Sequence, residues 1–355
     1  MYVHIFNNTN HKFSEPFFDF IERNFDIREH LFLIVGDYSI NEYRERENLV
    51  VLPNLKKEFG RFLKILKSSK RIFLHQLFFS LRILLFLNFQ RKILEKTYWV
   101  LWGGDLYFYI QNRGNFAVRL MDFVRKRFIK NIRGIVTFVR GDYELVKQHY
   151  KTKANYYYAF YPNPVGYKYL DTLLEAANKD KGKIVVLVGS SADPSNKHIE
   201  VFEKLEKFKA NGIKVVCPLS YGGKVEYTEK VIREGSRIFG EDFEPLTNFL
   251  KPEEYGKILK DVDVAVFNHD RQQGVGNILA LLYLGKKVYI KSTVTTWKMF
   301  EEKGVKVFDT YNLGEENFES FFGMSDEDRK HNHEIIKSEF SEEKCVYYWK
   351  KLFED

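Results

Sequence analysis

Short apolar runs alternate with helix-like runs along this chain of 355 residues. The runs 31–35, 71–75, 184–188 and 213–218 have the length and composition of buried strands. A helical pattern follows the last three, and a short strand at 49–52 separates the first from its helix. Such alternation predicts parallel sheets connected by crossover helices.

The alternating pattern occurs twice. It breaks between 156 and 182 into aromatic residues, the sequence YPNP and a polar helix, and then a new strand begins at 184. A chain of this length exceeds one ordinary core, so we predict the α/β class with two doubly wound domains. The predicted division is a first domain at 1–165, a linker at 166–182, a second domain at 183–335 and a final helical segment at 336–355.

Cysteine usage and hydropathy indicate the compartment. Cys217 and Cys345 are the two cysteines, and they form neither a disulfide framework nor a CxxC metal site. The opening sequence MYVHIFNNTN lacks the pattern of a secretory signal, and no stretch has the roughly 18 apolar residues of a spanning helix. We therefore expect a cytoplasmic protein.

Positive charge is concentrated in one segment. Between 56 and 96 there are 11 Lys or Arg against two Glu, whereas the whole chain carries a net charge of +8. The segment predicts a long apolar and basic helix over 78–96, which could be a core helix with a solvated basic end. Its charge permits nucleic acid or an anionic membrane as partner. Because no nucleic-acid motif accompanies it, we expect a membrane surface and no nucleic acid. The expected membrane-binding residues are Lys64, Lys67, Lys70 and Arg71.

Two loops in the second half follow predicted strands and precede helices. They are GSSADPSN, residues 189–196, and FNHDRQQGVGN, residues 267–277. In an open parallel sheet such positions bind ligands, because helix N-termini present free N–H groups to phosphate. Small-residue loops before helices are also common as plain architecture. Neither loop has the GxGxxG fingerprint or the lysine of a P-loop, which disfavours a dehydrogenase or an NTPase.

Two ionisable residues follow strands of the first half. Asp105 lies in WGGDLY, where it could act as a general base on an acceptor hydroxyl or hold the loop together. His75 ends the strand RIFLH and faces the same choice between a base and a buried, hydrogen-bonded histidine.

Several motifs together resemble a known family. WGGDLY, LVGSSADPSNKHI, CPLSYG and RQQGVGN are similar, in this order, to those of the TDP-N-acetylfucosamine:lipid II N-acetylfucosaminyltransferase family. This is also the 4-α-L-fucosyltransferase family, glycosyltransferase family 56. Ala192 stands where that family has a familiar glycine, and the basic apolar segment after His75 is more pronounced here.

The resemblance implies a GT-B enzyme with two Rossmann-like domains facing across a cleft. It implies no metal or other cofactor, a donor site in the second domain and a final helix that returns to the first. The implied reaction moves a deoxyamino sugar from a TDP-sugar to a polyprenyl-diphosphate-linked saccharide. It belongs to bacterial surface polysaccharide assembly of the enterobacterial common antigen type, at the cytoplasmic face of the inner membrane.

The resemblance also implies roles for individual residues. Tyr221 would lie near the base or ribose, Arg271 would close around the phosphate, and Asp105 would be the first candidate for acceptor activation. With His75, which its position after a strand suggests, Asp105 and Arg271 are the catalytic candidates. The residues expected around the donor diphosphate and sugar are Gly189, Ser190, Ser191, Asn196, Arg271, Gln272, Gln273, Gly274, Gly276 and Asn277.

Three alternatives stay open at this point. One is a catalytically inert membrane-associated subunit of a polysaccharide-assembly complex. Another is a glycosyltransferase of the same fold with a different deoxyhexose donor. A sugar-nucleotide epimerase or dehydrogenase is disfavoured, because the dinucleotide fingerprint and a Tyr-x-x-x-Lys pair near the candidate loops are missing.

Overall fold

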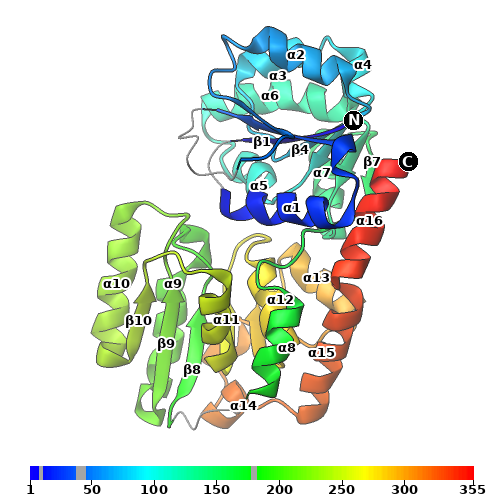
Figure 1. Ribbon diagram of the computed structural model, residues 1–355. Helices are drawn as coiled ribbons and strands as arrows, with labels where there is room; N and C mark the ends of the chain where they lie inside the picture. The colour runs from blue at the N-terminus through cyan, green and yellow to red at the C-terminus, as the bar shows by residue number, and fades with distance from the viewer. Residues whose placement is uncertain (8–10, 37–44, 177–181) are drawn as a thin grey trace. The chain divides into compact units, whose positions relative to one another are not determined.

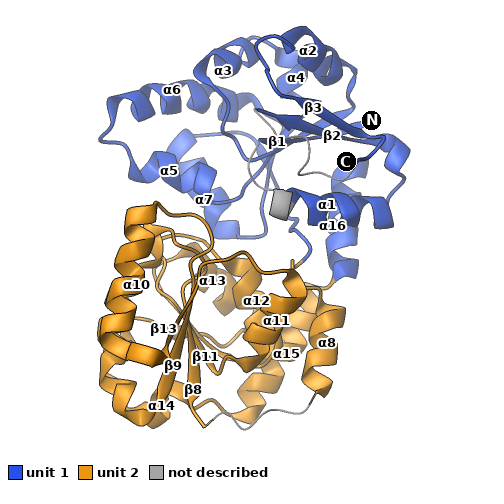
Figure 2. Ribbon diagram, turned by 60° about the vertical axis from the view of Figure 1, so that its left-hand side comes forward, with its two compact units in different colours: residues 1–162, 342–355 blue, residues 163–341 orange. Residues whose placement is uncertain are grey.

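The computed structural model describes residues 1–7, 11–36, 45–176 and 182–355 (Figure 1). The chain divides into two compact units, which Figure 2 colours separately. Unit 1 contains residues 1–162 and 342–355, and unit 2 contains residues 163–341.

A seven-stranded parallel sheet forms the centre of unit 1, in the order β3-β2-β1-β4-β5-β6-β7. The first strand lies inside the sheet because the chain winds outward from it in both directions. The strands are β1 Tyr2–Asn7, β2 His30–Val35, β3 Leu49–Leu52, β4 Arg71–His75, β5 Thr97–Val100, β6 Gly134–Val136 and β7 Asn155–Tyr157. The helices are α1 His11–Asn24, α2 Phe59–Ser68, α3 Leu81–Leu87, α4 Arg91–Leu94, α5 Gly104–Gln111, α6 Phe116–Asn131, α7 Arg140–Tyr150 and α16 Glu342–Glu354.

The long helix predicted over 78–96 is wrong. The structure has two short helices, α3 and α4, with a break at residues 88–90. At the break the N–H groups of Phe89 and Gln90 bond to carbonyls three residues back, and the Asn88 side chain donates to the Val124 carbonyl of α6 at 3.2 Å. The turn therefore lets both short helices pack on α6, which a single straight helix would not do.

The last helix, α16, is part of the core of unit 1. Trp349 is fully buried and its indole N–H donates to the Phe160 carbonyl at 2.8 Å. The Tyr2 hydroxyl donates to the Phe353 carbonyl at 2.8 Å, and the buried Arg71 guanidinium donates to the Leu352 carbonyl. Residues more than 280 positions apart in the sequence thus share one hydrophobic layer.

Unit 2 repeats the architecture with six parallel strands in the order β10-β9-β8-β11-β12-β13. The predicted α/β class, with two doubly wound Rossmann-like domains, is confirmed. The strands are β8 Ile184–Val188, β9 Ile213–Pro218, β10 Phe243–Leu246, β11 Val264–Phe267, β12 Lys287–Ile290 and β13 Phe308–Asp309. The helices are α8 Tyr167–Glu175, α9 His198–Leu205, α10 Val225–Phe239, α11 Pro252–Asp261, α12 Val275–Tyr283, α13 Thr295–Glu302, α14 Phe318–Phe322 and α15 Asp326–Glu339.

The stretch 166–182, expected to be a linker, begins with helix α8 of unit 2. The Tyr169 hydroxyl donates to the Glu253 carbonyl of α11 at 3.1 Å, and the Tyr283 hydroxyl of α12 donates to Asp171. These contacts make α8 a packed element of unit 2, which explains the aromatic composition of its sequence. Residues 177–181 lie outside the described part of the chain.

Candidate functional site: two loops at the switch point of unit 2

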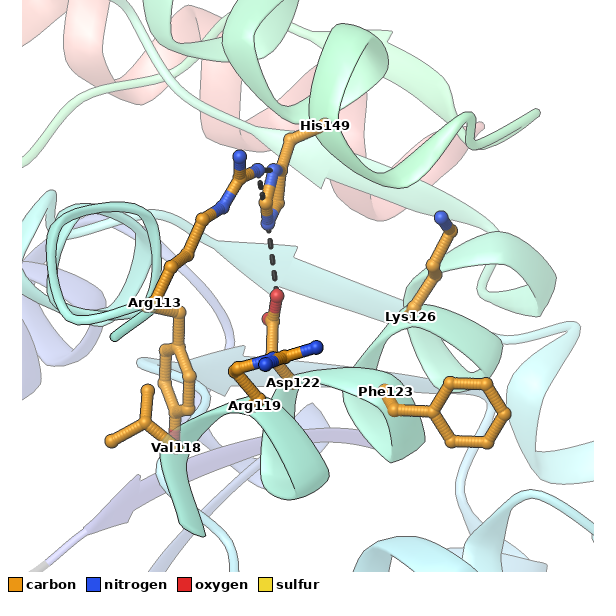
Figure 3. Close-up of a pocket in the computed structure, with 8 residues that line it drawn as sticks. Arg113, Val118, Arg119, Asp122, Phe123, Lys126 and His149 are labelled. Carbon is orange, nitrogen blue, oxygen red and sulfur yellow. Dashed lines mark hydrogen bonds and ion pairs between the residues drawn. The ribbon is translucent and has the colours of Figure 1, made fainter. Parts of the chain in front are cut away.

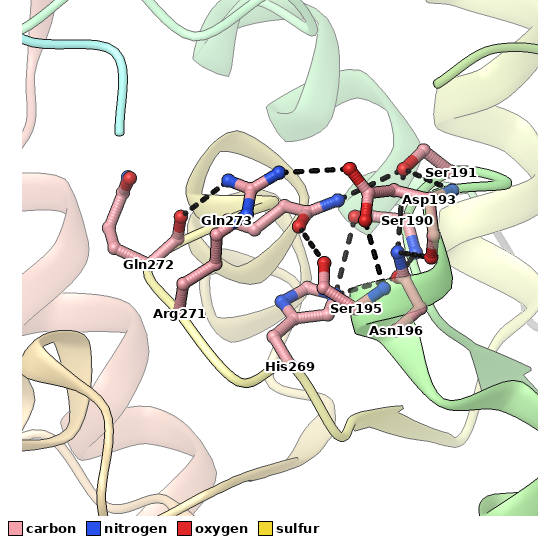
Figure 4. Close-up of polar contacts among 9 residues, drawn as sticks. All are labelled: Ser190, Ser191, Asp193, Ser195, Asn196, His269, Arg271, Gln272 and Gln273. Atoms are coloured by element: carbon pink, nitrogen blue, oxygen red, sulfur yellow. Dashed lines mark hydrogen bonds and ion pairs between the residues drawn. The ribbon is translucent and has the colours of Figure 1, made fainter. Parts of the chain in front are cut away.

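The loops after β8 and β11 meet in unit 2. These two strands are neighbours, with Val188 paired to Val266, and the Gly189 N–H donates to the Val266 carbonyl at 2.9 Å. The chain leaves β8 towards β9 on one side and enters β11 on the other, so this is the topological switch point of the sheet. Figure 4 shows the side chains of both loops converging there.

Asn196 is the centre of the arrangement. Its side chain is fully buried, and its Oδ1 accepts from the Ser190 N–H at 2.9 Å and from Nε2 of His269 at 2.8 Å. Its Nδ2 donates to the Asp193 carbonyl at 2.9 Å and lies 3.4 Å from the Ser191 hydroxyl. One side-chain amide therefore fixes the backbone of the first loop and its contact with the second.

Arg271 connects the two loops by an ion pair. Its Nη2 lies 3.0 Å from Oδ2 of Asp193, and its Nη1 donates to the Gln272 carbonyl at 3.2 Å. Burial raises the pKa of the Asp193 carboxyl, but hydrogen bonds from Ser195 and the Arg271 guanidinium lower the pKa overall. Since a guanidinium has five N–H donors and these contacts use two of its nitrogens, Arg271 retains donors for an anion.

Gln273 forms a second connection between the loops. Its Nε2 donates to the Ser191 hydroxyl at 3.0 Å, and its Oε1 accepts from the Ser195 hydroxyl at 2.8 Å. The neighbouring Gln272 differs, because its Oε1 is buried and accepts no hydrogen bond from the described residues. The Gln273 amide therefore holds the two loops together, whereas the Gln272 amide oxygen is left for other contacts.

Two glycines allow this close approach. Gly274 has a φ of +65°, and a Cβ placed on it would lie 2.8 Å from the Ser190 hydroxyl oxygen. Gly189 has a φ of +75°, and its Cβ would lie 2.6 Å from Nε2 of His198. Both positions combine a left-handed backbone with no room for a side chain, which only glycine satisfies without strain.

The N-terminus of α12 opens directly from the second loop. Gly274 is its N-cap and provides no side-chain hydrogen bond to the first turn. The first turn contains Gly276, whose carbonyl accepts from Asn163 at 3.0 Å, and the partly exposed Asn277. Uncapped N–H groups and the positive end of the helix dipole favour an anion at this point.

The loop after β9 packs on the first loop. The Tyr221 carbonyl accepts from the Ala192 N–H at 2.7 Å, while the Tyr221 side chain is 37% exposed. A Cβ on Gly222 would lie 3.2 Å from the Ser191 hydroxyl oxygen, so this loop also needs a glycine. Tyr221 is thus beside the site, where its ring can contact a flat group.

The structure brings the predicted donor-binding residues of all three loops to one edge of the sheet in unit 2. Sequence reasoning passed over two participants. His269 donates to Asn196, and its burial lowers its pKa to about 3, so the ring is neutral. Asp193 orients Arg271. Both residues stood in the quoted motifs, but only the fold shows that they contact the opposite loop.

The candidate base Asp105 is buried inside unit 1. Its Oδ2 accepts from the Leu77 N–H at 2.9 Å and the Trp99 indole at 2.6 Å, and its Oδ1 accepts from the Trp102 N–H at 3.2 Å. Burial raises the pKa of this carboxyl, although the Trp99 bond and the charge of Arg125 act against the rise. The Asp105 side chain has no exposed surface and accepts from three donors, so it holds the loops after β4 and β5 together. This is the structural role that the sequence left open beside that of a general base.

The second candidate base, His75, is also buried and belongs to a hydrogen-bonded chain. The Trp102 indole donates to the Tyr161 hydroxyl at 2.7 Å, and that hydroxyl contacts Nδ1 of His75. His75 Nε2 lies 3.1 Å from His4 Nδ1, and His4 Nε2 lies 3.0 Å from His30 Nδ1. All of these contacts are satisfied when the Tyr161 hydroxyl donates to His75 and each imidazole carries its proton on Nε2.

The three histidines of this hydrogen-bonded series, His75, His4 and His30, are neutral. Burial lowers the pKa of His75 and of His4 well below the usual value, and lowers the pKa of His30 to about 4. Both ring nitrogens of His75 are used, so the satisfied-histidine alternative describes it better than the general base does.

The four expected membrane-binding residues have different surroundings. Lys64 and Lys67 are exposed on α2, and Lys70 is exposed with its Nζ 3.2 Å from the Tyr2 hydroxyl. Arg71 is buried and donates to α16, so its expected place on the surface is wrong. Its position in β4 explains this, because every residue of that strand is covered.

The described part of the chain contains neither a metal-ligand cluster nor a membrane span. Within the described ranges, no three His, Cys, Asp or Glu side chains are grouped as they would be to hold a metal ion. In the same part of the chain, every helix is too short or too polar to span a membrane.

Comparison with known proteins adds a family and a fold. Residues 29–320 match the model of one family, described as 4-alpha-L-fucosyltransferase glycosyl transferase group 56.

Solved structures align over nearly the whole chain at low sequence identity. A glycosyltransferase from Rickettsia africae is 10% identical, with a TM-score of 0.69, and the match covers 99% of this chain and 97% of that one. A UDP-forming α,α-trehalose-phosphate synthase from Burkholderia xenovorans is 12% identical, with a TM-score of 0.66 and the same coverage. WaaG, a glycosyltransferase involved in lipopolysaccharide biosynthesis, is 10% identical, with a TM-score of 0.64 and 98% of both chains covered. These likenesses identify the fold as GT-B.

Proposed function

The chain belongs to the 4-alpha-L-fucosyltransferase family, glycosyl transferase group 56, and from this premise we propose its donor, acceptor and pathway. It is a nucleotide-sugar-dependent glycosyltransferase, so it has a donor and an acceptor. The proposed reaction moves a deoxyamino sugar of the N-acetylfucosamine type from a TDP-sugar to a polyprenyl-diphosphate-linked saccharide. The proposed setting is bacterial surface polysaccharide assembly at the cytoplasmic face of the inner membrane, with the protein peripheral to it.

The observation that carries this proposal is the group of N–H donors at the switch point of unit 2, formed by Arg271 and the first turn of α12. When the bond between sugar C1 and the diphosphate oxygen breaks, negative charge develops on the leaving diphosphate. Arg271 is already held in place by Asp193, and the uncapped first turn of α12 lies in the same loop. Donors fixed before the reaction stabilise the developing charge without the cost of ordering them.

The amide and hydroxyl groups of the site suit a sugar diphosphate. Ser190, Ser191 and Gln272 offer hydroxyl and amide groups, and buried Oε1 of Gln272 can accept from a sugar hydroxyl or a base N–H. Because these groups and Arg271 would bind an anion directly, we propose that transfer needs no metal or other cofactor. Turnover measured with and without EDTA tests this, and a loss restored by a divalent cation would overturn it.

The donor is tested by calorimetric titration of the full chain with TDP, and with UDP and GDP for comparison. We expect TDP to bind most tightly and Arg271→Ala to weaken its binding by about tenfold or more, as for a charge-assisted hydrogen bond. Arg233→Ala is the matched control, because Arg233 is 68% exposed on α10 of the same unit. Equal binding of all three nucleotides, or an unchanged Arg271→Ala, would contradict the proposed donor site.

Transfer itself is tested with TDP-N-acetylfucosamine and a polyprenyl-diphosphate disaccharide. Product formation supports the proposal, and a different TDP-deoxyhexose that reacts faster would point to the same fold with another donor. Selective TDP binding with no turnover on any such donor would favour the inert-subunit alternative.

A further inference from the structure

The most exposed phenylalanines in the described part of the chain gather on unit 1. Phe89, Phe116 and Phe123 are 75%, 78% and 74% exposed. Phe116 and Phe123 lie on α6, and Phe89 follows α3, where the Arg127 guanidinium of α6 lies 5.6 Å from its ring centre. Three large apolar side chains on one surface are costly in water unless something covers them.

These phenylalanines share the surface with cations. On α6, steps of three or four positions connect Phe116, Arg119, Leu120, Phe123, Lys126, Arg127 and Lys130, which are exposed except for the half-buried Lys126. They therefore form one stripe, whereas Val124, Phe128 and Ile129 face the core. The stripe contains four basic residues, and the single carboxylate of α6, Asp122, is already bonded to His149 at 2.9 Å and Tyr150 at 2.7 Å. We call this surface the α6 face; it consists of Phe89, Phe116, Arg119, Leu120, Phe123, Lys126, Arg127 and Lys130.

A pocket with a volume of about 310 Å³ opens beside the stripe. Its polar lining includes Arg113, Arg119, Lys126, His149 and the already bonded carboxylate of Asp122, and the apolar wall includes Phe123. Figure 3 shows Arg113 beside the His149 ring and Asp122 on the other side of that ring. Because His149 donates Nε2–H to Asp122, its Nδ1 accepts from Arg113, which fixes that guanidinium at the pocket. The pocket thus gathers three cations beside an apolar rim.

We propose that the α6 face docks on a bilayer that contains anionic phospholipids, with a lipid headgroup phosphate in this pocket. Phenylalanines would enter the boundary between headgroups and acyl chains, while the flexible Arg and Lys side chains reach the phosphates. Membrane docking would bring the enzyme to its lipid-linked acceptor, so this inference rests on the proposed function. The membrane contact then lies on α6 rather than on the lysines of α2.

Charge argues against two other occupants. A second copy of this chain would bring two sets of these cations together in a symmetric interface, which repels. The core of a protein interface is depleted of lysine and other charges, but here cations and phenylalanines alternate along one helix. An interfacial membrane helix combines these residue types in this way.

The test uses the full chain labelled at Phe123→Cys with an environment-sensitive fluorophore. Cys217 and Cys345 are buried, so the label attaches to the new thiol. We expect a blue shift with vesicles of phosphatidylcholine and phosphatidylglycerol, and little change with phosphatidylcholine alone. The same label at Val225→Cys, on an equally exposed position of unit 2, should not shift.

Charge variants separate the α6 face from α2. Arg119→Gln with Lys126→Gln should weaken vesicle binding by about tenfold or more, since each cation near an anionic surface contributes about fivefold. Lys64→Gln with Lys67→Gln removes the same charge from α2 and should weaken binding by at most about twofold. Equal losses in the two pairs would overturn the proposal.

Apolar variants test insertion. Phe116→Ser should weaken vesicle binding by about tenfold, while its thermal unfolding stays that of the wild type because the ring is exposed. Dimerisation in sedimentation that Phe116→Ser abolishes would instead assign the face to self-association. Inorganic phosphate that releases the protein from vesicles at constant ionic strength would assign the pocket to a soluble phosphate.

The outcome is separable from that of the proposed function. Transfer to a short-chain, water-soluble acceptor should be the same in Phe116→Ser and the wild type. If that transfer and TDP binding occur while anionic vesicles are not bound, the membrane inference fails and the proposed function stands.

Discussion

Arg271 Nη2 lies 3.0 Å from Asp193 Oδ2, although the two residues are 78 positions apart in the sequence. Each follows a different strand of the unit 2 sheet, so the ion pair closes one loop on the other. A diphosphate that binds Arg271 therefore meets a guanidinium whose direction is already set, and any change that separates the loops should reduce donor binding.

Gly274→Ala tests the close approach of the loop after β11 to the loop after β8. The new Cβ would lie 2.8 Å from the Ser190 hydroxyl oxygen, and the φ of +65° adds about 1 kcal/mol or more of backbone strain. We expect at least tenfold weaker TDP binding by calorimetry. Gly314→Ala is the control, because a Cβ there meets nothing within 4 Å. Unchanged TDP binding in Gly274→Ala would separate this loop from the donor.

Asn196→Ala should affect stability and donor binding together. It leaves the Ser190 N–H and His269 Nε2 without their buried acceptor, at a cost of about 1–3 kcal/mol for each group. We expect a lower midpoint of urea unfolding and loss of TDP binding. Asn211→Ala, at an exposed position of unit 2, should change neither quantity. A stable Asn196→Ala that binds TDP normally would show that the amide is dispensable.

Asp105→Asn distinguishes a structural carboxylate from a catalytic one. All three partners of the carboxylate are donors. Whichever oxygen the asparagine NH2 group replaces, that group therefore faces a donor and loses the hydrogen bond. We expect destabilisation by about 2–4 kcal/mol, measured by urea unfolding. The remaining folded protein should turn over at a rate near that of the wild type. Wild-type stability with no turnover at saturating substrates would instead restore Asp105 as the base.

The stability of unit 1 should decrease as the pH falls below about 6.5. The folded-state pKa values of His4, His30 and His75 lie below that of an unfolded histidine, so the unfolded chain binds more protons in this range. Each histidine contributes a loss of at most about 1.4 kcal/mol per pH unit, which for His30 levels off near its folded pKa of about 4. His198 and His269 act in the same direction in unit 2.

Urea unfolding followed by tryptophan fluorescence measures this pH dependence, because three of the four tryptophans, Trp99, Trp102 and Trp349, are in unit 1. His30→Gln should make the dependence shallower, and His331→Gln, at an exposed position, is the control. A free energy of unfolding that stays constant between about pH 6.5 and 4 would contradict the neutral chain.

Local sequence patterns predicted strands well and side-chain environments poorly. β8 and β9 have the predicted bounds, because a run of buried β-branched and aliphatic residues has no competing conformation. The break at 88–90 was missed, since it depends on a hydrogen bond from Asn88 to a helix 36 positions away. The burial of Asp105 and His75 also depends on contacts with residues distant in the sequence, so their positions near strand ends did not predict it.

The candidate donor site was more predictable than the surroundings of Asp105 and His75. Glycines, hydroxyls and an arginine after buried strands are local signals, and parallel strands bring such loops to one edge. The ion pair between Asp193 and Arg271 needed the strand order, which places β8 beside β11. The charge excess at 56–96 did not predict the cations of α6, because a charge count does not show which side chains are exposed.

The discontinuity of unit 1 affects how the protein forms and how it can be dissected. Unit 2 lies in the sequence between the two segments of unit 1, and α16 supplies Trp349 and Phe353 to the core of unit 1. During synthesis, unit 1 therefore waits for its last helix until all of unit 2 has been translated. A fragment of residues 163–341 contains every strand of its own sheet, whereas a fragment of residues 1–162 exposes the apolar surface that α16 covers and is expected to aggregate.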